Sequence, residues 1–196
     1  MKAICETINA GPVREDHRII FDMVAENSKV LDLGCGDGDL LLKLVRHKKV
    51  HASGIEVSPG AIRSCVARGL SVLQGDIEDG LAEYPAGSYD YVILNQSLQE
   101  VRQAGRVIDE ALRIGRCAVI GFPNFAHISA RLTLMFRGRA PVTDSLPYHW
   151  FDTPNVRFFS IRDFREFCQT KGITIEKAFY LGRNGEIACW PNLRAH

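Results

Sequence analysis

Apolar and polar positions form alternating blocks along residues 30–122, and these blocks predict strands and helices in turn. Short apolar runs bounded by turn residues are typical of strands buried on both faces. Apolar side chains three and four positions apart, as at Leu40, Leu41 and Leu44, are typical of a helix with one buried face. We expect strands at 30–34, 50–56, 71–74, 89–94 and 117–122, and helices at 15–26, 38–47, 58–68 and 104–113.

Strands that alternate with helices in this way predict an α/β fold, with a doubly wound, mostly parallel, Rossmann-like sheet in a three-layer arrangement. The last third of the chain departs from the alternation. It predicts a helix at 161–170 and a strand at 173–181, with residues 187–190 as a further strand that pairs as a hairpin. We therefore expect an antiparallel C-terminal strand, within a single domain 1–196.

Residues 122–160 form a connection much longer than the usual few residues between a strand and a helix. Residues 125–136 predict a helix within it, because Phe125, Ile128 and Leu132 share one face. The segment is rich in aromatic residues and arginine, and two interpretations stay open. It is either a lid over a substrate pocket or a surface that docks a partner, and a simpler alternative is that its aromatic rings only cover the sheet.

Four polar residues of this connection are candidates for the mouth of the pocket: Asn124, His127, Tyr148 and His149. In the lid interpretation, Tyr148, His149 and the arginines hold an anionic substrate. A hydroxyl or amine acceptor would use His127 or His149 as a general base. Catalytic residues are otherwise unknown, and a structural or partner-facing role is the competing interpretation for each candidate.

Composition and charge narrow the class of protein. A net charge of +1 gives no bias toward nucleic acid or an anionic membrane. No run approaches the roughly 20 apolar residues of a membrane span, and the N-terminus lacks the apolar core of a signal peptide, so we expect a cytoplasmic protein. The six cysteines form no C-x-x-C pair, which favours structural thiols and predicts no metal site.

The run VLDLGCGDG at 30–38 is typical of a buried strand that ends in a glycine-rich turn and opens into a helix. Glycine allows the backbone to approach a ligand closely. Asp32, Asp37 and Asp39 are negative where NAD or FAD would place a pyrophosphate, and Asp39 replaces the third glycine of a dinucleotide loop. A cationic nucleoside without phosphates fits better, so we predict a site for S-adenosyl-L-methionine, with a turn shaped by Gly34, Gly36 and Gly38.

Further candidates follow the other strands, because ligands of doubly wound sheets lie beyond the carboxyl ends of the strands. Glu56 ends the second strand, where a carboxylate accepts hydrogen bonds from ribose hydroxyls. Val57 is placed to pack on the adenine, and Asp76 to accept from its amine with Ile77 alongside. Asn95 ends the fourth strand and faces the same crevice.

Structural alternatives exist for the acidic residues. Asp37 or Asp39 caps the following helix in one interpretation, and Asp76 is an ordinary turn residue in another. Each feature is weak evidence when taken alone. The combination of strand, D-x-G-x-G-x-G turn, helix, strand and Glu56 is much more specific.

The segment 30–38 resembles motif I of class I methyltransferases, and other segments extend the likeness. With GIEVSPGAI, GDIEDGL, YDYVILNQSLQEV, GFPNFAHISARLTLMFRGRAPV and PYHWFDTPNVRFFSIRDF, the chain resembles the MetW family of methionine-biosynthesis proteins from about residue 12 to 184. The segments after Gly121 are the specific part. Residues 186–196 match no segment that we assign.

The resemblance implies a methyltransferase-type fold, in which an antiparallel sheet end is usual, and a link to homoserine O-acyltransferase (MetX). It implies that S-adenosyl-L-methionine (or S-adenosylhomocysteine) is bound by Asp32, Gly34, Gly36, Glu56 and Asp76. The family name identifies a pathway and gives no methyl acceptor.

Three hypotheses for function follow. In the first, the chain is an accessory partner of the acyltransferase that supports or regulates homoserine acylation. In the second, it is a free-standing methyltransferase acting on a small molecule. A third, an NAD-dependent redox enzyme, is disfavoured by Asp32 and Asp39.

Overall fold

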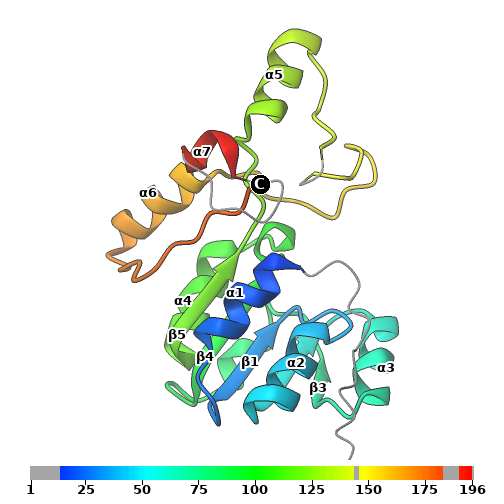
Figure 1. Ribbon diagram of the computed structural model, residues 1–196, viewed down its shortest axis with the longest axis vertical. Coiled ribbons are helices and arrows are strands. Elements are labelled where there is room, and N and C mark those ends of the chain that lie inside the picture. Colours follow the sequence, from blue (N-terminus) through cyan, green and yellow to red (C-terminus); the bar gives the residue numbers. More distant parts are fainter. Residues whose placement is uncertain (1–13, 144–145, 183–189, 196) are drawn as a thin grey trace, which may run out of the picture.

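The protein is described by a computed structural model for residues 14–143, 146–182 and 190–195 (Figure 1). Five strands form one parallel sheet in the order β3-β2-β1-β4-β5. They are β1 (Lys29–Leu33), β2 (His51–Glu56), β3 (Val72–Gln74), β4 (Tyr89–Asn95) and β5 (Gly115–Gly121). The winding direction reverses between β1 and β4, so their carboxyl ends flank the crevice where such sheets bind ligands.

Helices cover both faces of the sheet, which confirms the predicted layered α/β arrangement. The first face carries α1 (Glu15–Met23), α2 (Asp39–Lys48) and α3 (Pro59–Ala67), and the second carries α4 (Ala104–Ile114) and α6 (Ile161–Lys171). Val30 belongs to the core cluster of the first face and Leu31 to that of the second. Successive strand side chains point to opposite faces, so a continuous apolar run fills both cores.

The predicted antiparallel C-terminal strand is wrong for the part of it that the structure describes. Residues 173–180 carry no regular secondary structure, although their alternation is strand-like. A cavity of about 220 Å³ lies between this segment and β5, lined by Ala118 and Ile120 on one side and by Ile175 and Tyr180 on the other. The apolar side chains of the segment therefore border a cavity beside β5. Of the proposed hairpin partner 187–190, all but Trp190 lies outside the described residues.

In its described residues, the long connection after β5 contains one helix, α5 (Ile128–Arg137), which projects away from the sheet in Figure 1. It begins later than predicted, because His127 is its N-cap and its ring nitrogen accepts from the Ser129 N–H. Gly138, in a left-handed conformation, ends it. The short elements are η1 (Leu81–Glu83), η2 (Leu98–Glu100) and α7 (Pro191–Arg194). Within the described ranges, no helix is long and apolar enough to span a membrane.

Candidate functional site

A cavity of about 410 Å³ opens at the carboxyl ends of β1, β2 and β4. Its position follows from the topology, because three parallel strands deliver their end residues to the same edge of the sheet. Eight of the nine residues predicted to bind the cofactor line it: Asp32, Gly34, Gly36, Glu56, Val57, Asp76, Ile77 and Asn95.

The exception is Gly38, which the structure does not bring into the cavity lining. Its φ of +80° places it in the left-handed region at the N-cap of α2. A Cβ there would lie 2.5 Å from Leu70 Cδ1 and 2.8 Å from Cys65 Sγ. Gly38 therefore allows α2 to pack closely against the end of α3 and the segment after it.

Glu56 organises the glycine-rich turn. Its Oε2 accepts a hydrogen bond from the Gly36 N–H at 2.9 Å. Its Oε1 accepts from the N–H groups of Val57 and Ser58, at 2.9 and 2.8 Å. Sequence reasoning anticipated a carboxylate facing the ribose and missed these bonds, because a carboxylate so close to a strand end meets the neighbouring backbone first. Glu56, at the end of β2, therefore holds the glycine-rich turn after β1 in place.

Asp32 is buried in the cavity wall, with 3% of its surface exposed. Among the residues of known placement, none donates a hydrogen bond to its carboxylate. Burial, and secondly the negative charge of Glu56, raise the pKa of Asp32 to about 7. A buried carboxylate without a partner is costly, and protonation or a cationic ligand relieves that cost.

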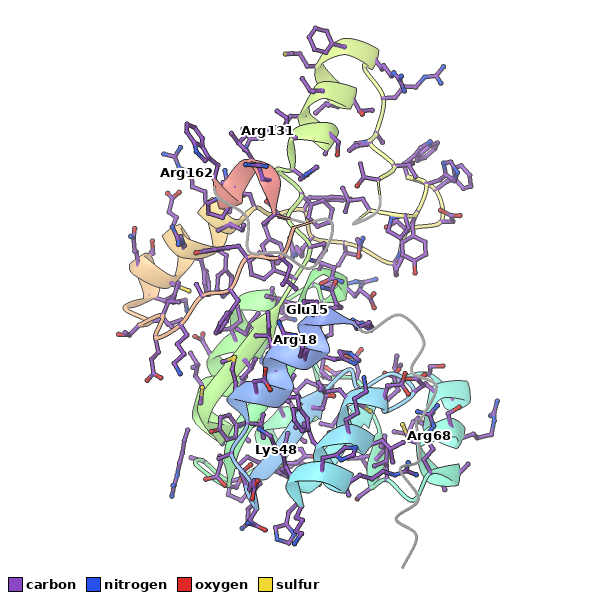
Figure 2. All side chains as sticks on the ribbon, in the orientation of Figure 1. Glu15, Arg18, Lys48, Arg68, Arg131 and Arg162 are labelled. Atoms are coloured by element: carbon purple, nitrogen blue, oxygen red, sulfur yellow. The ribbon has the colours of Figure 1, made fainter. Side chains whose placement is uncertain are left out.

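Asp37 and Asp39 also line the cavity, but their charges are partly compensated. The Arg68 guanidinium forms an ion pair with Asp39 and donates to the Asp37 carbonyl, and Figure 2 shows Arg68 on the α3 side. Asp37 Oδ1 accepts weakly from the Asp39 N–H at 3.3 Å, at the start of α2. No pattern in the sequence pointed to Arg68, which lies about thirty positions further along the chain.

Asp76 and Asn95 occupy opposite sides of the cavity. Asp76 Oδ1 accepts from the Glu78 N–H at 2.9 Å, so the turn interpretation holds for one oxygen. Asn95 Nδ2 donates to Asp16 Oδ2 at 2.9 Å. Asn95 Oδ1 is buried and finds no hydrogen-bond partner among the described residues. A Cβ on Gly121 would lie 2.3 Å from this oxygen, so a larger residue there would displace the Asn95 side chain.

Sequence reasoning missed several other lining residues, among them Arg14, His17, Ser97 and Glu100. Burial lowers the pKa of His17, and burial together with Glu56 raises the pKa of Glu100. Ser97 Oγ donates to the Leu33 carbonyl at 2.8 Å and ties the end of β4 to the end of β1. The pattern predicted a helix at 15–26, but periodicity does not show which of its side chains turn toward the cavity.

The candidate catalytic residues His127, Tyr148 and His149 do not line the cavity. Tyr148 and His149 are exposed on the connection after α5, and His127 caps α5. Asn124 is buried and its Nδ2 donates to the Ala195 carbonyl at 3.1 Å, which anchors α7. No cluster of three His, Cys, Asp or Glu side chains that would hold a metal ion occurs in the part of the chain described.

The sheet order, the glycine turn at the end of β1 and the acidic cavity define the fold of class I S-adenosylmethionine-dependent methyltransferases. A Thermotoga maritima structure described as such a methyltransferase, a possible histamine N-methyltransferase, superposes with a TM-score of 0.62, covering 89% of this chain and 77% of that one at 19% identity. A ubiquinone biosynthesis O-methyltransferase of Psychrobacter arcticus is 25% identical over 56% of this chain and 45% of its own length.

The chain belongs to the MetW family: residues 14–196 match the family described as methionine biosynthesis protein MetW, as the resemblance predicted. A bifunctional methionine biosynthesis protein MetXA/MetW of Rhodopirellula baltica is 34% identical over 92% of this chain. The match spans only 31% of that relative's length, so the relative contains a much larger portion without a counterpart here.

Proposed function

We propose that the cavity binds S-adenosyl-L-methionine or S-adenosylhomocysteine. The observation that carries this proposal is the buried Asp32 carboxylate, which has no described partner in a cavity that other carboxylates also line. Such a site favours a cationic ligand, and both candidate ligands carry an ammonium group. A pyrophosphate would meet repulsion from Asp32 and Glu56.

The lining residues fit the parts of this nucleoside. Each Glu56 oxygen already accepts backbone N–H groups, but carboxylate oxygens have further lone pairs that remain for the ribose hydroxyls. Val57 and Ile77 offer apolar contact to the adenine, and the second oxygen of Asp76 is available to its amine. Asp32 would hold the ammonium end.

The biological role that we propose is that of an accessory partner of homoserine O-acyltransferase (MetX), supporting or regulating homoserine acylation. The support is the Rhodopirellula baltica relative, whose name joins MetXA and MetW in a single chain. A ligand that binds the assembled form preferentially shifts assembly by its difference in affinity. The cavity would in this way report the level of S-adenosyl-L-methionine to the acyltransferase.

Calorimetry with S-adenosyl-L-methionine and S-adenosylhomocysteine tests the ligand, with and without purified acyltransferase from the same organism. We expect saturable binding of at least one nucleoside, weakened at least tenfold by Asp32→Ala. A mixture of both proteins should acylate homoserine faster than the acyltransferase alone. Binding of neither nucleoside contradicts the ligand assignment, and unchanged acylation contradicts the partnership.

A second candidate function, a free-standing small-molecule methyltransferase, is favoured by the cavity beside β5. Asn95 and Gln96 line both cavities, and Asn95 Oδ1 is a buried acceptor without a hydrogen-bond partner among the described residues. Bound S-adenosyl-L-methionine would supply an electrophilic methyl group, and the second cavity would position a mainly apolar acceptor with a hydrogen-bond donor. Formation of S-adenosylhomocysteine that depends on an added acceptor supports this function. No turnover across a metabolite panel, with binding intact, contradicts it.

A further inference from the structure

Residues 126–157, here called the arm, leave the sheet and return to it as one projection (Figure 1). The described arm carries large apolar side chains that are mostly exposed to solvent. Leu134, Met135 and Phe136 are 60%, 67% and 75% exposed at the end of α5. Trp150 and Phe151 are 77% and 69% exposed. Folded monomers rarely expose so much contiguous apolar surface unless it binds something.

The arm is also positively charged. Residues 126–157 include four arginines and two acidic residues, Asp144 and Asp152. Arg137 and Arg139 form no ion pair with any described residue, and both are exposed. Arginine, aromatic residues and methionine are the side chains enriched at protein interfaces. The arm therefore has both the apolar and the charged components of a docking surface.

The aromatic part of the arm is already arranged. The His149 and Phe151 rings stack at 5.4 Å with an interplanar angle of 2°, and Trp150 meets Phe151 edge-on at 5.7 Å. Ring contacts fix these side chains before a partner arrives, which reduces the entropy lost on binding. A preformed cluster of exposed rings favours protein recognition over a role as loose cover.

The base of the arm is tied to the body of the protein. The Phe125 N–H donates to the Phe159 carbonyl at 3.3 Å and joins its two ends. The Val156 and Arg157 N–H groups donate to the Gln99 carbonyl at 2.9 and 3.0 Å. Arg131 Nη2 donates to the Asn192 carbonyl of α7 at 3.3 Å, beside Arg162 in Figure 2. These hydrogen bonds fix the base of the arm to the body of the protein, and the rest of the arm projects from it.

We propose that the arm is the surface that docks homoserine O-acyltransferase, by inserting its apolar tip and aromatic cluster into an apolar depression with an acidic rim. This proposal rests on the proposed partnership with the acyltransferase and adds where on this chain the partner binds. A closed lid is the weaker interpretation, because the exposed tip and aromatic cluster do not line the cavity and α5 points away from the sheet.

A second copy of this chain fits the arm less well than the acyltransferase. A twofold interface places the same patch on both sides, so two positively charged surfaces would face each other. Like charges across an interface suppress association, whereas an acidic rim on a different protein attracts them. The Rhodopirellula baltica relative, described as bifunctional, joins MetXA and MetW in one polypeptide. In that protein such an interface would be intramolecular.

The test measures affinity for purified homoserine O-acyltransferase from the same organism, using the full chain. The arm variants are Met135→Ser with Phe136→Ser, Trp150→Ser, and Arg137→Glu with Arg139→Glu. Val66→Ser and Arg63→Glu on α3 are matched controls, because Val66 is 61% exposed and Arg63 is also exposed. We expect each arm variant to lose at least about tenfold in affinity and the controls to stay within about threefold. S-adenosyl-L-methionine affinity should be unchanged in all five.

Each other outcome overturns a distinct statement. Arm variants that bind the acyltransferase as the wild type does overturn the docking surface and leave the partnership intact. A wild-type protein that does not bind at all overturns the partnership itself. Arm variants that lose nucleoside binding make the arm part of the ligand site. A change in self-association by sedimentation, with acyltransferase affinity intact, assigns the arm to a second copy.

Discussion

Asp32 combines deep burial with a raised pKa, so its ionisation opposes folding. The folded pKa of about 7 exceeds the ordinary value of 3.8, which means that the folded state holds the proton more tightly than the unfolded state. The contribution of Asp32 to the free energy of unfolding is therefore most favourable below about pH 4 and becomes less favourable as the pH rises toward 7. Above pH 7 the Asp32 carboxyl is ionised in both the folded and the unfolded state, and its destabilising effect no longer changes with pH.

Asp32→Asn should consequently stabilise the ligand-free protein at pH 8 by about 1–4 kcal/mol, because it removes a buried charge while retaining the shape. At pH 4 the variant and the wild type should unfold at nearly the same denaturant concentration. Urea unfolding at both pH values measures the difference. An equal gain at pH 4 and pH 8 would mean that packing, and not ionisation, is responsible.

The raised pKa of Asp32 also predicts that ligand binding is accompanied by the release of a proton. A cationic ligand next to Asp32 favours its charged form, so binding at pH 6.5–7 should release a proton and affinity should rise as the pH approaches 8. Calorimetry of S-adenosyl-L-methionine in buffers with different ionisation enthalpies measures that proton. Asp32→Asn should abolish the release, while His17→Gln should keep it. Release that persists in Asp32→Asn would assign the proton to Glu100 or another group.

A comparison of substitutions at Gly38 and Gly69 separates the cost of backbone strain from the cost of overpacking the core. Both have positive φ, +80° and +77°, but a Cβ on Gly69 meets no atom within 4 Å, whereas one on Gly38 collides with Leu70 and Cys65. Gly69→Ala should cost about 1 kcal/mol of unfolding free energy, and Gly38→Ala roughly 1–3 kcal/mol more, because the added methyl overpacks the core. Chemical denaturation of both variants measures this. Equal losses would show that α2 shifts freely to accept the methyl group.

Among the elements, the parallel strands were predictable and the chain after α6 was not. The run at 30–34 is apolar on both faces, and a strand buried between two helical layers admits little else. Residues 173–180 alternate as a strand would, but alternation specifies only which side chains turn inward. Pairing also requires the backbone to reach β5, and a cavity lies between β5 and these residues.

The same contrast applies to the site. Asp32, Glu56 and Asn95 were predictable because topology brings strand ends together. The bonds of Glu56 to backbone N–H groups and the pairing of Arg68 with Asp39 depend on side-chain directions that no spacing encodes. The sequence therefore predicts which positions form a ligand site at the strand ends. The pairing of charges within that site can be predicted only from the three-dimensional structure.

The arm and the sheet should behave as separate units. Replacing residues 128–152 by a Gly-Ser linker of about eight residues preserves the bonds at the root, from Phe125 to Phe159 and from Val156 to Gln99. We expect a melting temperature within a few degrees of the wild type, unchanged nucleoside affinity and no binding to the acyltransferase. Thermal unfolding and calorimetry measure these quantities. Loss of nucleoside affinity on excision would show that the arm shapes the cavity.

In the molecule as a whole, the cavity and the arm meet on the segment that contains η2. Glu100 and Val101 line the cavity, and the preceding Gln99 carbonyl accepts both N–H groups at the arm root. Glu78, also in the cavity lining, accepts from the Arg102 and Gln103 N–H groups at 3.0 and 2.6 Å. A ligand that moves this segment would change the arm, and the reverse also holds.

Such coupling must be reciprocal in binding free energy. If S-adenosyl-L-methionine changes the affinity for the acyltransferase by some factor, the acyltransferase must change the affinity for the nucleoside by the same factor. We expect a factor of roughly five to ten, measured by two independent calorimetric titrations. Arg157→Ala should reduce it, since the Arg157 guanidinium donates to the Arg102 carbonyl, whereas Arg162→Ala on α6 should not. A factor of one in the wild type would mean that the nucleoside does not regulate docking, and the cavity would then serve the protein in methyl transfer or in stability alone.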